Sequence, residues 1–151
     1  MVNFNPVVTK TFAELTKTEL YSILALRMQV FCVEQNCPYQ DIDGIDQQSI
    51  HIFIKQQQQV CAYARIIPAT KNQCHIGRVV VAANFRKNKL ATHIMHHCIQ
   101  YCQTKFAGTT IEISAQSYLT EFYKNLGFIS TGHYYLEDDI PHEQMHLRLR
   151  Q

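Results

Sequence analysis

A strand, a basic turn and a helix follow one another from Ile76 to Met95, and this stretch constrains the fold more than any other. Residues 76–81 form a short apolar run rich in β-branched side chains, which is typical of a buried strand. From about Lys89 the apolar residues recur on one broad helical face. The first N–H groups of a helix have no partner within the helix, and the helix dipole adds partial positive charge there. The turn is therefore expected to bind an anion, most naturally a phosphate or pyrophosphate.

The turn also carries formal positive charge, because Arg86, Lys87 and Lys89 lie within it. Two common phosphate-binding sequences, G-x-x-x-x-G-K-[ST] and G-x-G-x-x-G, do not occur in the chain. On its own, the pattern fits a plain strand–helix unit with a solvated basic turn as well as it fits a phosphate site.

Length and composition indicate one globular domain. The chain has 151 residues, of which 46% are apolar and 17% charged, so it can bury a sizeable core. The net charge of +2 is too small to indicate a nucleic-acid partner. No apolar run of about 18 residues is present, and the N-terminus has neither the basic nor the apolar region of a signal peptide. We therefore expect a cytoplasmic protein without a membrane partner, either a monomer or a homodimer.

The cysteines and histidines do not predict a metal site. None of the six cysteines forms a C-x-x-C pair, and buried free thiols in a reducing cytoplasm explain them best. His93 and His97 are four residues apart on the polar face of the central helix, where a solvated face is favoured over a metal site. The D-x-D-G-x-D run from Asp41 to Asp46 lacks the spacing of a calcium-binding EF-hand.

Periodicity and turn residues predict a chain of the order βα(α)βββαβαββ. Thr16 and Glu19 form a capping box that begins the first helix. We expect an irregular segment with exposed aspartates over 33–46 and a loop over 136–143. A strand–helix–strand crossover near the centre implies one parallel pair inside an otherwise antiparallel sheet. The predicted strands span 7–15, 50–55, 60–67, 74–81, 110–114, 128–134 and 144–150, and the helices 16–31, 89–106 and 118–125.

Two motifs in this order resemble those of the GNAT superfamily of N-acetyltransferases. The segment R-x-x-K-L-A from Arg86 to Ala91 is similar to the R/Q-x-x-G-x-G/A signature that holds the acetyl-CoA pyrophosphate. Lys89 replaces the middle glycine, although lysine resists backbone conformations that glycine allows. Gln116, Leu119 and Tyr123 occupy the positions of the N-x-x-A-x-x-x-Y motif, with glutamine in place of asparagine, and Gly127-Phe128 matches the G-F after it.

The resemblance extends over nearly the whole chain and is closest to the ElaA-like branch. It is carried by the phrases LRMQVFCVEQNCPYQDIDGID, AYARI, IGRVVV, SAQSYLTEFYKNLGF and LEDDIPHEQM. It implies the α/β (α+β) GNAT acyltransferase fold, with a mixed, mostly antiparallel central sheet, a splayed parallel pair and flanking helices. It also implies an N-acetyltransferase that uses acetyl-CoA as co-substrate, needs no metal and acts on an amine. The alternative is a module of the same fold that binds acyl-CoA without catalysis.

The resemblance also implies roles for individual residues. Tyr123 would give a proton to the leaving CoA thiolate, whereas a purely structural Tyr123 would pack under the Gly127-Phe128 turn. The base is open among Glu34, His51, Glu112 and His142, of which Glu34 lies where GNAT proteins build the acceptor pocket. Glu34, His51 and His142 are also expected to bind the acceptor. The expected acetyl-CoA contacts are Val79, Val80, Val81, Arg86, Lys87, Asn88, Lys89, Leu90, Ala91, Thr92, Gln116 and Tyr123.

The segments expected around the acceptor mouth, 34–46 and 137–142, carry seven acidic residues and neither lysine nor arginine. A mouth with this balance would attract cationic amines. The other explanation is that these acids only keep two exposed loops soluble.

Overall fold

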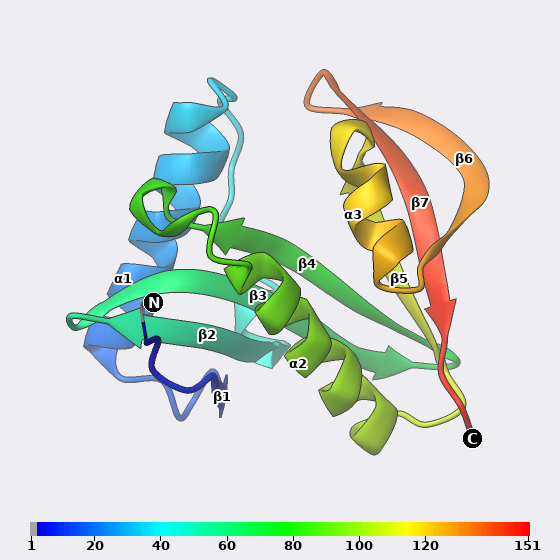
Figure 1. The fold of residues 1–151 in the computed structure, drawn as a ribbon, viewed down its shortest axis with the longest axis horizontal. Coiled ribbons are helices and arrows are strands. Elements are labelled where there is room, and N and C mark those ends of the chain that lie inside the picture. Colours follow the sequence, from blue (N-terminus) through cyan, green and yellow to red (C-terminus); the bar gives the residue numbers. More distant parts are fainter. Residues whose placement is uncertain (1–2) are drawn as a thin grey trace.

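Seven strands form one mixed sheet in the computed structural model, which describes residues 3–151 (Figure 1). The strand order across the sheet is β1-β2-β3-β4-β5-β7-β6. Every neighbouring pair is antiparallel except β4 and β5, which run parallel because a helix connects them. The expected mixed sheet with one parallel pair is therefore confirmed. The strands are β1 Val8–Thr11, β2 Ile50–Gln56, β3 Gln59–Thr70, β4 Gln73–Val81, β5 Thr110–Gln116, β6 Ile129–Glu137 and β7 Ile140–Arg148.

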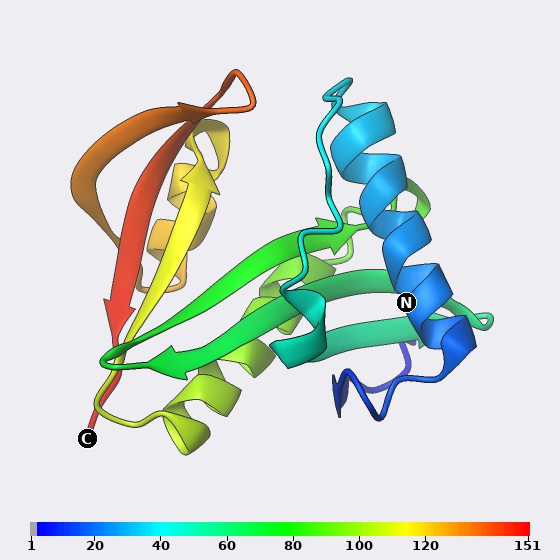
Figure 2. The same ribbon diagram turned by 180° about the vertical axis from the view of Figure 1, so that it is seen from behind.

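The parallel pair opens into a V soon after it begins. Gln73 to His75 of β4 pair with Thr110 to Glu112 of β5, and beyond His75 the two strands have no further paired residues. Figures 1 and 2 show β4 and β5 diverging, so that the sheet becomes two halves that touch at one end. The splayed pair that the resemblance implied is therefore present.

Two helices cover opposite faces of the larger half of the sheet (Figures 1 and 2). Side chains alternate between the faces of a strand, so Ile52 and Ile54 of β2 pack in the cluster of α2 (Leu90–Lys105), while Phe53 packs in that of α1 (Lys17–Arg27). The third helix, α3 (Thr120–Asn125), contacts β5 in the smaller half. The helical order predicted from periodicity is therefore confirmed.

The first helix begins and ends differently. At its start, the Thr16 hydroxyl accepts from the Glu19 N–H at 3.0 Å and the Glu19 carboxylate accepts from the Thr16 N–H at 2.9 Å, which confirms the capping box. At its end the chain continues as a π-helix, η1 (Met28–Glu34). Wide turns of this type are frequent at functional sites.

The acidic segment between the last two strands differs from the loop expected over 136–143. Strands β6 and β7 continue through it and are joined at Asp138 and Asp139, whose φ angles are 51° and 64°. Two consecutive left-handed residues give the twist that a tight hairpin needs, and aspartate tolerates this conformation better than most residues. The remaining short helices are the 3₁₀ turns η2 (Asp46–Gln48), η3 (Ala83–Phe85) and η4 (Ser117–Leu119).

Candidate active site

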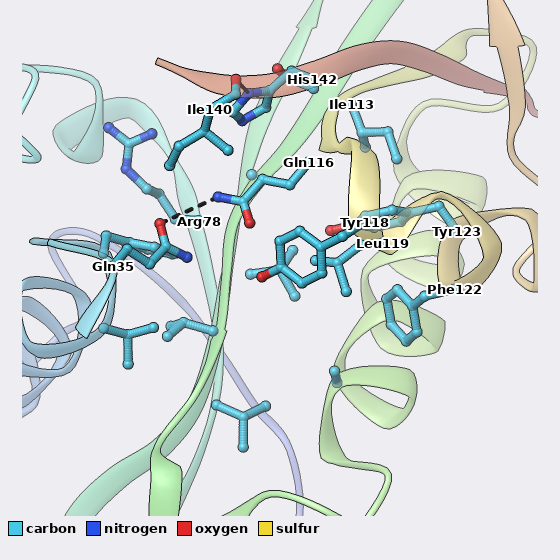
Figure 3. A pocket seen from close by; sticks show the side chains of 18 of the residues that line it. Gln35, Arg78, Ile113, Gln116, Tyr118, Leu119, Phe122, Tyr123, Ile140 and His142 are labelled. Atoms are coloured by element: carbon cyan, nitrogen blue, oxygen red, sulfur yellow. Dashed lines mark hydrogen bonds between the residues drawn. The ribbon is translucent and has the colours of Figure 1, made fainter. Parts of the chain in front are cut away.

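A cleft of about 580 Å³ fills the V between β4 and β5. Its walls come from both halves of the molecule: β4, the basic turn and α2 on one side, and β5, α3 and the β6–β7 hairpin on the other. The end of η1 forms a third wall (Figure 3). Most of the predicted site residues line it together, namely Glu34, Val79, Val80, Val81, Arg86, Lys87, Lys89, Leu90, Ala91, Thr92, Gln116, Tyr123 and His142.

A β-bulge shapes the β4 wall. Tyr63 of β3 pairs with Val80, and Arg65 pairs with Gly77, so that Arg78 and Val79 together oppose one residue of β3. Arg78 has a φ of 54°, a conformation that non-glycine residues adopt rarely. The bulge bends β4 beside the cleft, where its edge no longer pairs with β5.

The basic turn leads into α2 without a side-chain cap. Lys89, the N-cap residue, has φ 59° and ψ 26°, and none of its side-chain atoms caps the helix. It therefore takes the left-handed conformation for which the family signature has glycine. Asn88 does not line the cleft; its side-chain amide donates to the Phe85 and Arg86 carbonyls and supports the turn from within. The first N–H groups of α2 face the end of the cleft that Lys87 and Lys89 also border.

Arg86 and Glu34 form an ion pair at the rim of the cleft. The guanidinium donates to the two carboxylate oxygens at 3.0 and 2.6 Å, and a further bond to the Val81 carbonyl at 3.1 Å orients it. The hydrogen bond from Arg86 holds the pKa of Glu34 below its usual value. Glu34 is thus a weaker base than a free carboxylate.

Tyr123 reaches the cleft from α3 and is 7% exposed. Phe122 and Phe128 pack edge-on against its ring, with centroid separations of 5.0 and 6.1 Å. Burial, and then the neighbouring Tyr118, raises the pKa of Tyr123 to about 12. The phenol therefore keeps its proton at neutral pH and can act as a donor.

Gln116, at the end of β5, spans the cleft. Its side-chain amide donates to the Gln35 side chain at 3.3 Å, which joins the smaller half of the sheet to the residue after η1 (Figure 3). His142 is the Cα partner of Gln116 on β7, so the two side chains lie on the same face. His142 is 6% exposed and lines the cleft next to Ile140 (Figure 3).

Two other predicted candidates lie outside the cleft. His51 does not line it and is fully buried, with its ring nitrogens 2.7 Å from the Tyr63 hydroxyl and 2.9 Å from the Asp46 carbonyl. The structure therefore places His51 apart from the predicted site residues that line the cleft, because its strand face points into the core. Glu112 accepts hydrogen bonds from Gln73 and Gln144 and does not line the cleft either.

A cluster of three arginines and three aspartates, which we name the Arg–Asp cluster, lies at the bulge, and four of its six members are buried. Arg27 is fully buried and bonds Asp41 and Asp46, each at 2.7 Å. Arg78 binds Asp41 at 2.7 Å and stacks on the Tyr39 ring. The members of the cluster are Arg27, Arg65, Arg78, Asp41, Asp43 and Asp46.

The Arg–Asp cluster corrects two expectations. Asp41 and Asp46 are buried rather than exposed, and their charges are compensated by arginines. With Glu34 paired with Arg86, the acids of the predicted mouth that line the cleft without an arginine partner are Glu137 and Asp138, at the hairpin turn. One signal in the sequence pointed to the cluster: Arg27 occupies an apolar position of the first helix, and a charge on a buried face needs a buried partner.

No cluster of three or more metal-ligating side chains is found among the described residues. His93 and His97 have ring centroids 6.2 Å apart on α2. The six cysteines are free, and all except Cys32 are buried. Within residues 3–151, no helix is long and apolar enough to cross a membrane.

Comparisons with known proteins agree on one family. The sequence profile of the Acetyltransferase (GNAT) domain matches residues 15–149. Protein ElaA of Escherichia coli is 39% identical over 134 residues, covering 86% of this chain and 88% of ElaA. A UPF0039 protein of Schizosaccharomyces pombe is 38% identical over 144 residues, covering 94% and 96% of the two chains. The crystal structure of an acyl-CoA N-acyltransferase from Pseudomonas aeruginosa superposes with a TM-score of 0.89 at 36% identity, covering 97% of this chain and 100% of that one.

Proposed function

The chain belongs to the GNAT acetyltransferase family, and on that premise we propose that it transfers the acetyl group of acetyl-CoA to the nitrogen of an amine. The observation that carries the proposal is the cleft between β4 and β5. One cavity contains a free strand edge, a basic helix N-terminus and a buried protonated tyrosine. These three features suit, in turn, an extended amide-containing chain, a pyrophosphate and a leaving thiolate.

The two ends of the donor fit different parts of the cleft. The pantetheine arm has amide groups, and the unpaired edge of β4 at Val79 and Val81 can bond them as an added strand would. The pyrophosphate fits the first N–H groups of α2, with Lys87 and Lys89 beside them. Arg86, which Glu34 holds at the rim of the cleft, would add its positive charge beside the pyrophosphate.

The reacting carbonyl would lie at the β4 bulge. There a main-chain N–H can stabilise the negative charge that develops on the thioester oxygen during attack. Tyr123 would give its proton to the sulfur as the carbon–sulfur bond breaks. Because burial raises the pKa of Tyr123 to about 12, the phenol carries its proton at neutral pH, so the proton is present when the thiolate leaves.

Tyr123→Phe tests the proposal, because it keeps the ring and removes only the donated proton. Turnover, measured as free thiol released from acetyl-CoA across a pool of amines, is expected to fall about 100-fold. The CoA affinity measured by calorimetry and the melting temperature are expected to stay close to those of the wild type. Tyr21→Phe, at an 80% exposed position of α1, is the matched control.

Two outcomes would contradict the proposal. A Tyr123→Phe protein that turns over at the wild-type rate has another proton donor. A wild-type protein that binds acetyl-CoA but releases no thiol with any amine is a binding module, which is the alternative that the family resemblance leaves open.

A further inference from the structure

The base that receives the amine proton can be identified from the hydrogen bonds of the candidates. Glu34 is held by Arg86, and its pKa is lowered, so it accepts protons poorly. His51 and Glu112 do not line the cleft. The remaining candidate of the four is His142, which lines the cleft and is not paired with a cationic side chain.

The position of His142 defines its tautomer. Its Nδ1 lies 2.6 Å from the Ile140 carbonyl oxygen, and a carbonyl can only accept a hydrogen bond. Nδ1 therefore carries the hydrogen, and in the neutral ring Nε2 carries the free lone pair. Stacking on Tyr135, with the ring planes 16° apart, fixes the orientation of the imidazole.

The Nε2 lone pair faces a carboxylate. It is 3.5 Å from Oε2 of Glu137, and Asp138 follows in the same hairpin wall. Two hydrogen-bond acceptors this close together on one wall of the cleft form a site for a donor with several hydrogens and a positive charge. An alkylammonium has three N–H donors and one positive charge, so it can bond both groups at once.

This pair lies in the same cleft as the proposed reaction centre. His142 is the strand partner of Gln116, which lines the cleft and reaches across it to Gln35 (Figure 3). Figure 3 also shows Tyr118, Leu119 and Tyr123 on the wall next to Gln116. An amine bound between Glu137 and His142 thus shares one cavity with the bulge and with the proposed proton donor.

We propose that Glu137 and His142 bind the acceptor as a primary alkylammonium and that His142 Nε2 is the general base. The inference rests on the proposed acetyl transfer and specifies its acceptor side. Glu137 positions the cation, and His142 removes its proton.

Each proton and each bond in the proposed acetyl transfer has a defined destination. The ammonium gives one proton to His142, and its nitrogen then attacks the thioester carbon. The carbon–nitrogen bond forms, the carbon–sulfur bond breaks and Tyr123 protonates the sulfur. The amide nitrogen returns its surplus proton to Tyr123 through water, and His142 releases its own proton to solvent past the half-exposed Glu137. One proton leaves for each amide formed.

The kinetic test compares ethylamine with 2,2,2-trifluoroethylamine as acceptors. The fluorines withdraw electron density, so at neutral pH trifluoroethylamine is mostly unprotonated and needs no base before attack. His142→Gln is expected to lower kcat/KM for ethylamine about 100-fold or more, and that for trifluoroethylamine only a few-fold. His146→Gln, on the same strand but outside the cleft, is the control.

Glu137→Gln is expected to raise KM for ethylamine about tenfold while kcat changes little, because the carboxylate binds the cation and does not react. Glu121→Gln, at an 84% exposed position on α3, is the control.

A second measurement does not depend on turnover. Proton–nitrogen correlation spectra of protein labelled with ¹⁵N-histidine are expected to show His142 as the Nδ1–H tautomer, its signals being assigned by their loss in His142→Gln. Ethylammonium is expected to shift the His142 Nε2 signal. Tetramethylammonium, a cation without N–H donors, is expected to leave it unchanged.

The outcomes separate this inference from the proposed function. An Nε2–H tautomer, equal losses with the two amines in His142→Gln, or a selective loss with ethylamine in Glu34→Gln would overturn the assignment of the base. If the wild type releases no thiol with either amine, acetyl transfer to small amines is contradicted, and the nitrogen signals still decide whether the ammonium site exists.

Discussion

Three residues that border the cleft have positive φ angles, which are unfavourable for residues other than glycine. Arg78, Lys87 and Lys89 have φ angles of 54°, 67° and 59°. At Arg78, ion pairs with Asp41 and Asp43 hold the side chain beside the bulge. At Lys89, a lysine takes the left-handed position at the start of α2, which adds a positive charge where a glycine would add none.

Because Lys89 has a left-handed backbone, glycine is expected to stabilise the protein more than alanine at this position, which is the reverse of the order in a helix interior. Lys89→Gly and Lys89→Ala remove the same charge, but only glycine relieves the left-handed backbone. The glycine variant is expected to have a free energy of unfolding about 1 kcal/mol greater than that of the alanine variant, measured by urea denaturation. In a helix interior the order is the reverse, so a more stable alanine variant would show that Lys89 is not left-handed in solution.

At the scale of elements, α1 and η1 act together to present one end of the cleft. The capping box fixes the start of α1, and the π-helix after it brings Glu34 and Gln35 to the rim. The Glu19 carboxylate also forms ion pairs with the ammonium groups of Lys10 and Lys55, at 2.9 and 2.8 Å. One buried carboxylate therefore connects α1 to β1 and β2.

Glu19 makes the stability of this corner depend on pH. Burial alone would raise its pKa, but the hydrogen bonds from Lys55, the Thr16 N–H and Lys10 outweigh burial and lower the pKa from 4.5 to about 2. A lowered pKa in the folded state means that the stabilisation is complete above about pH 4.5 and is lost as the pH falls toward 2. The stability difference between the wild type and Glu19→Gln is therefore expected to be large at pH 7 and to shrink across this window.

Urea denaturation at pH 7, 4 and 3 measures this difference, with Glu121→Gln as the exposed control. A difference that stays constant down to pH 3 would mean that Glu19 stabilises the fold through its shape and not through its charge.

The order of the elements could be predicted because its signals are local. Thr16 and Glu19 are three residues apart, and alternation in β2 is visible within seven residues. The turn at Asp138 was missed because two aspartates lack the usual hairpin signal of asparagine or aspartate followed by glycine.

The candidate site could be predicted where its residues are neighbours in the sequence. It could not be predicted where segments far apart in the sequence meet. The turn at Lys89 is continuous in sequence, and its residues line the cleft together. Arg78 and Asp41 are 37 residues apart, and no periodicity shows that they bind each other. The tautomer of His142 likewise depends on how the hairpin bends, which decides that the Ile140 carbonyl faces the ring.

At the scale of the whole molecule, the two halves of the sheet are joined through three residue pairs between β4 and β5. A ligand that bonds the free edge of β4 and the wall of β5 adds contacts between halves that otherwise meet at one end. Binding to the folded state then raises the stability of the entire chain.

CoA at about 100 times its dissociation constant is expected to raise the free energy of unfolding by about 2.7 kcal/mol, as seen in thermal denaturation. The shift is expected to shrink with added salt, because screening weakens phosphate binding. Ala91→Trp, at the start of α2, is expected to abolish the shift by blocking the phosphates. Ala107→Trp, just beyond the other end of the helix, is the control. An undiminished shift in Ala91→Trp would show that CoA binds elsewhere.

The Arg–Asp cluster also restricts how this protein can change over evolutionary time. Its three positive and three negative charges cancel, and each charge has at least one buried partner. Losing one of the four buried members, Arg27, Arg65, Asp41 or Asp46, leaves an unmatched charge in the interior. Such a loss costs on the order of 3–5 kcal/mol, which is comparable to much of the stability of a small domain. Substitutions among these buried members are therefore expected to be tolerated only in compensating sets, so that the support of the β4 bulge evolves as one unit.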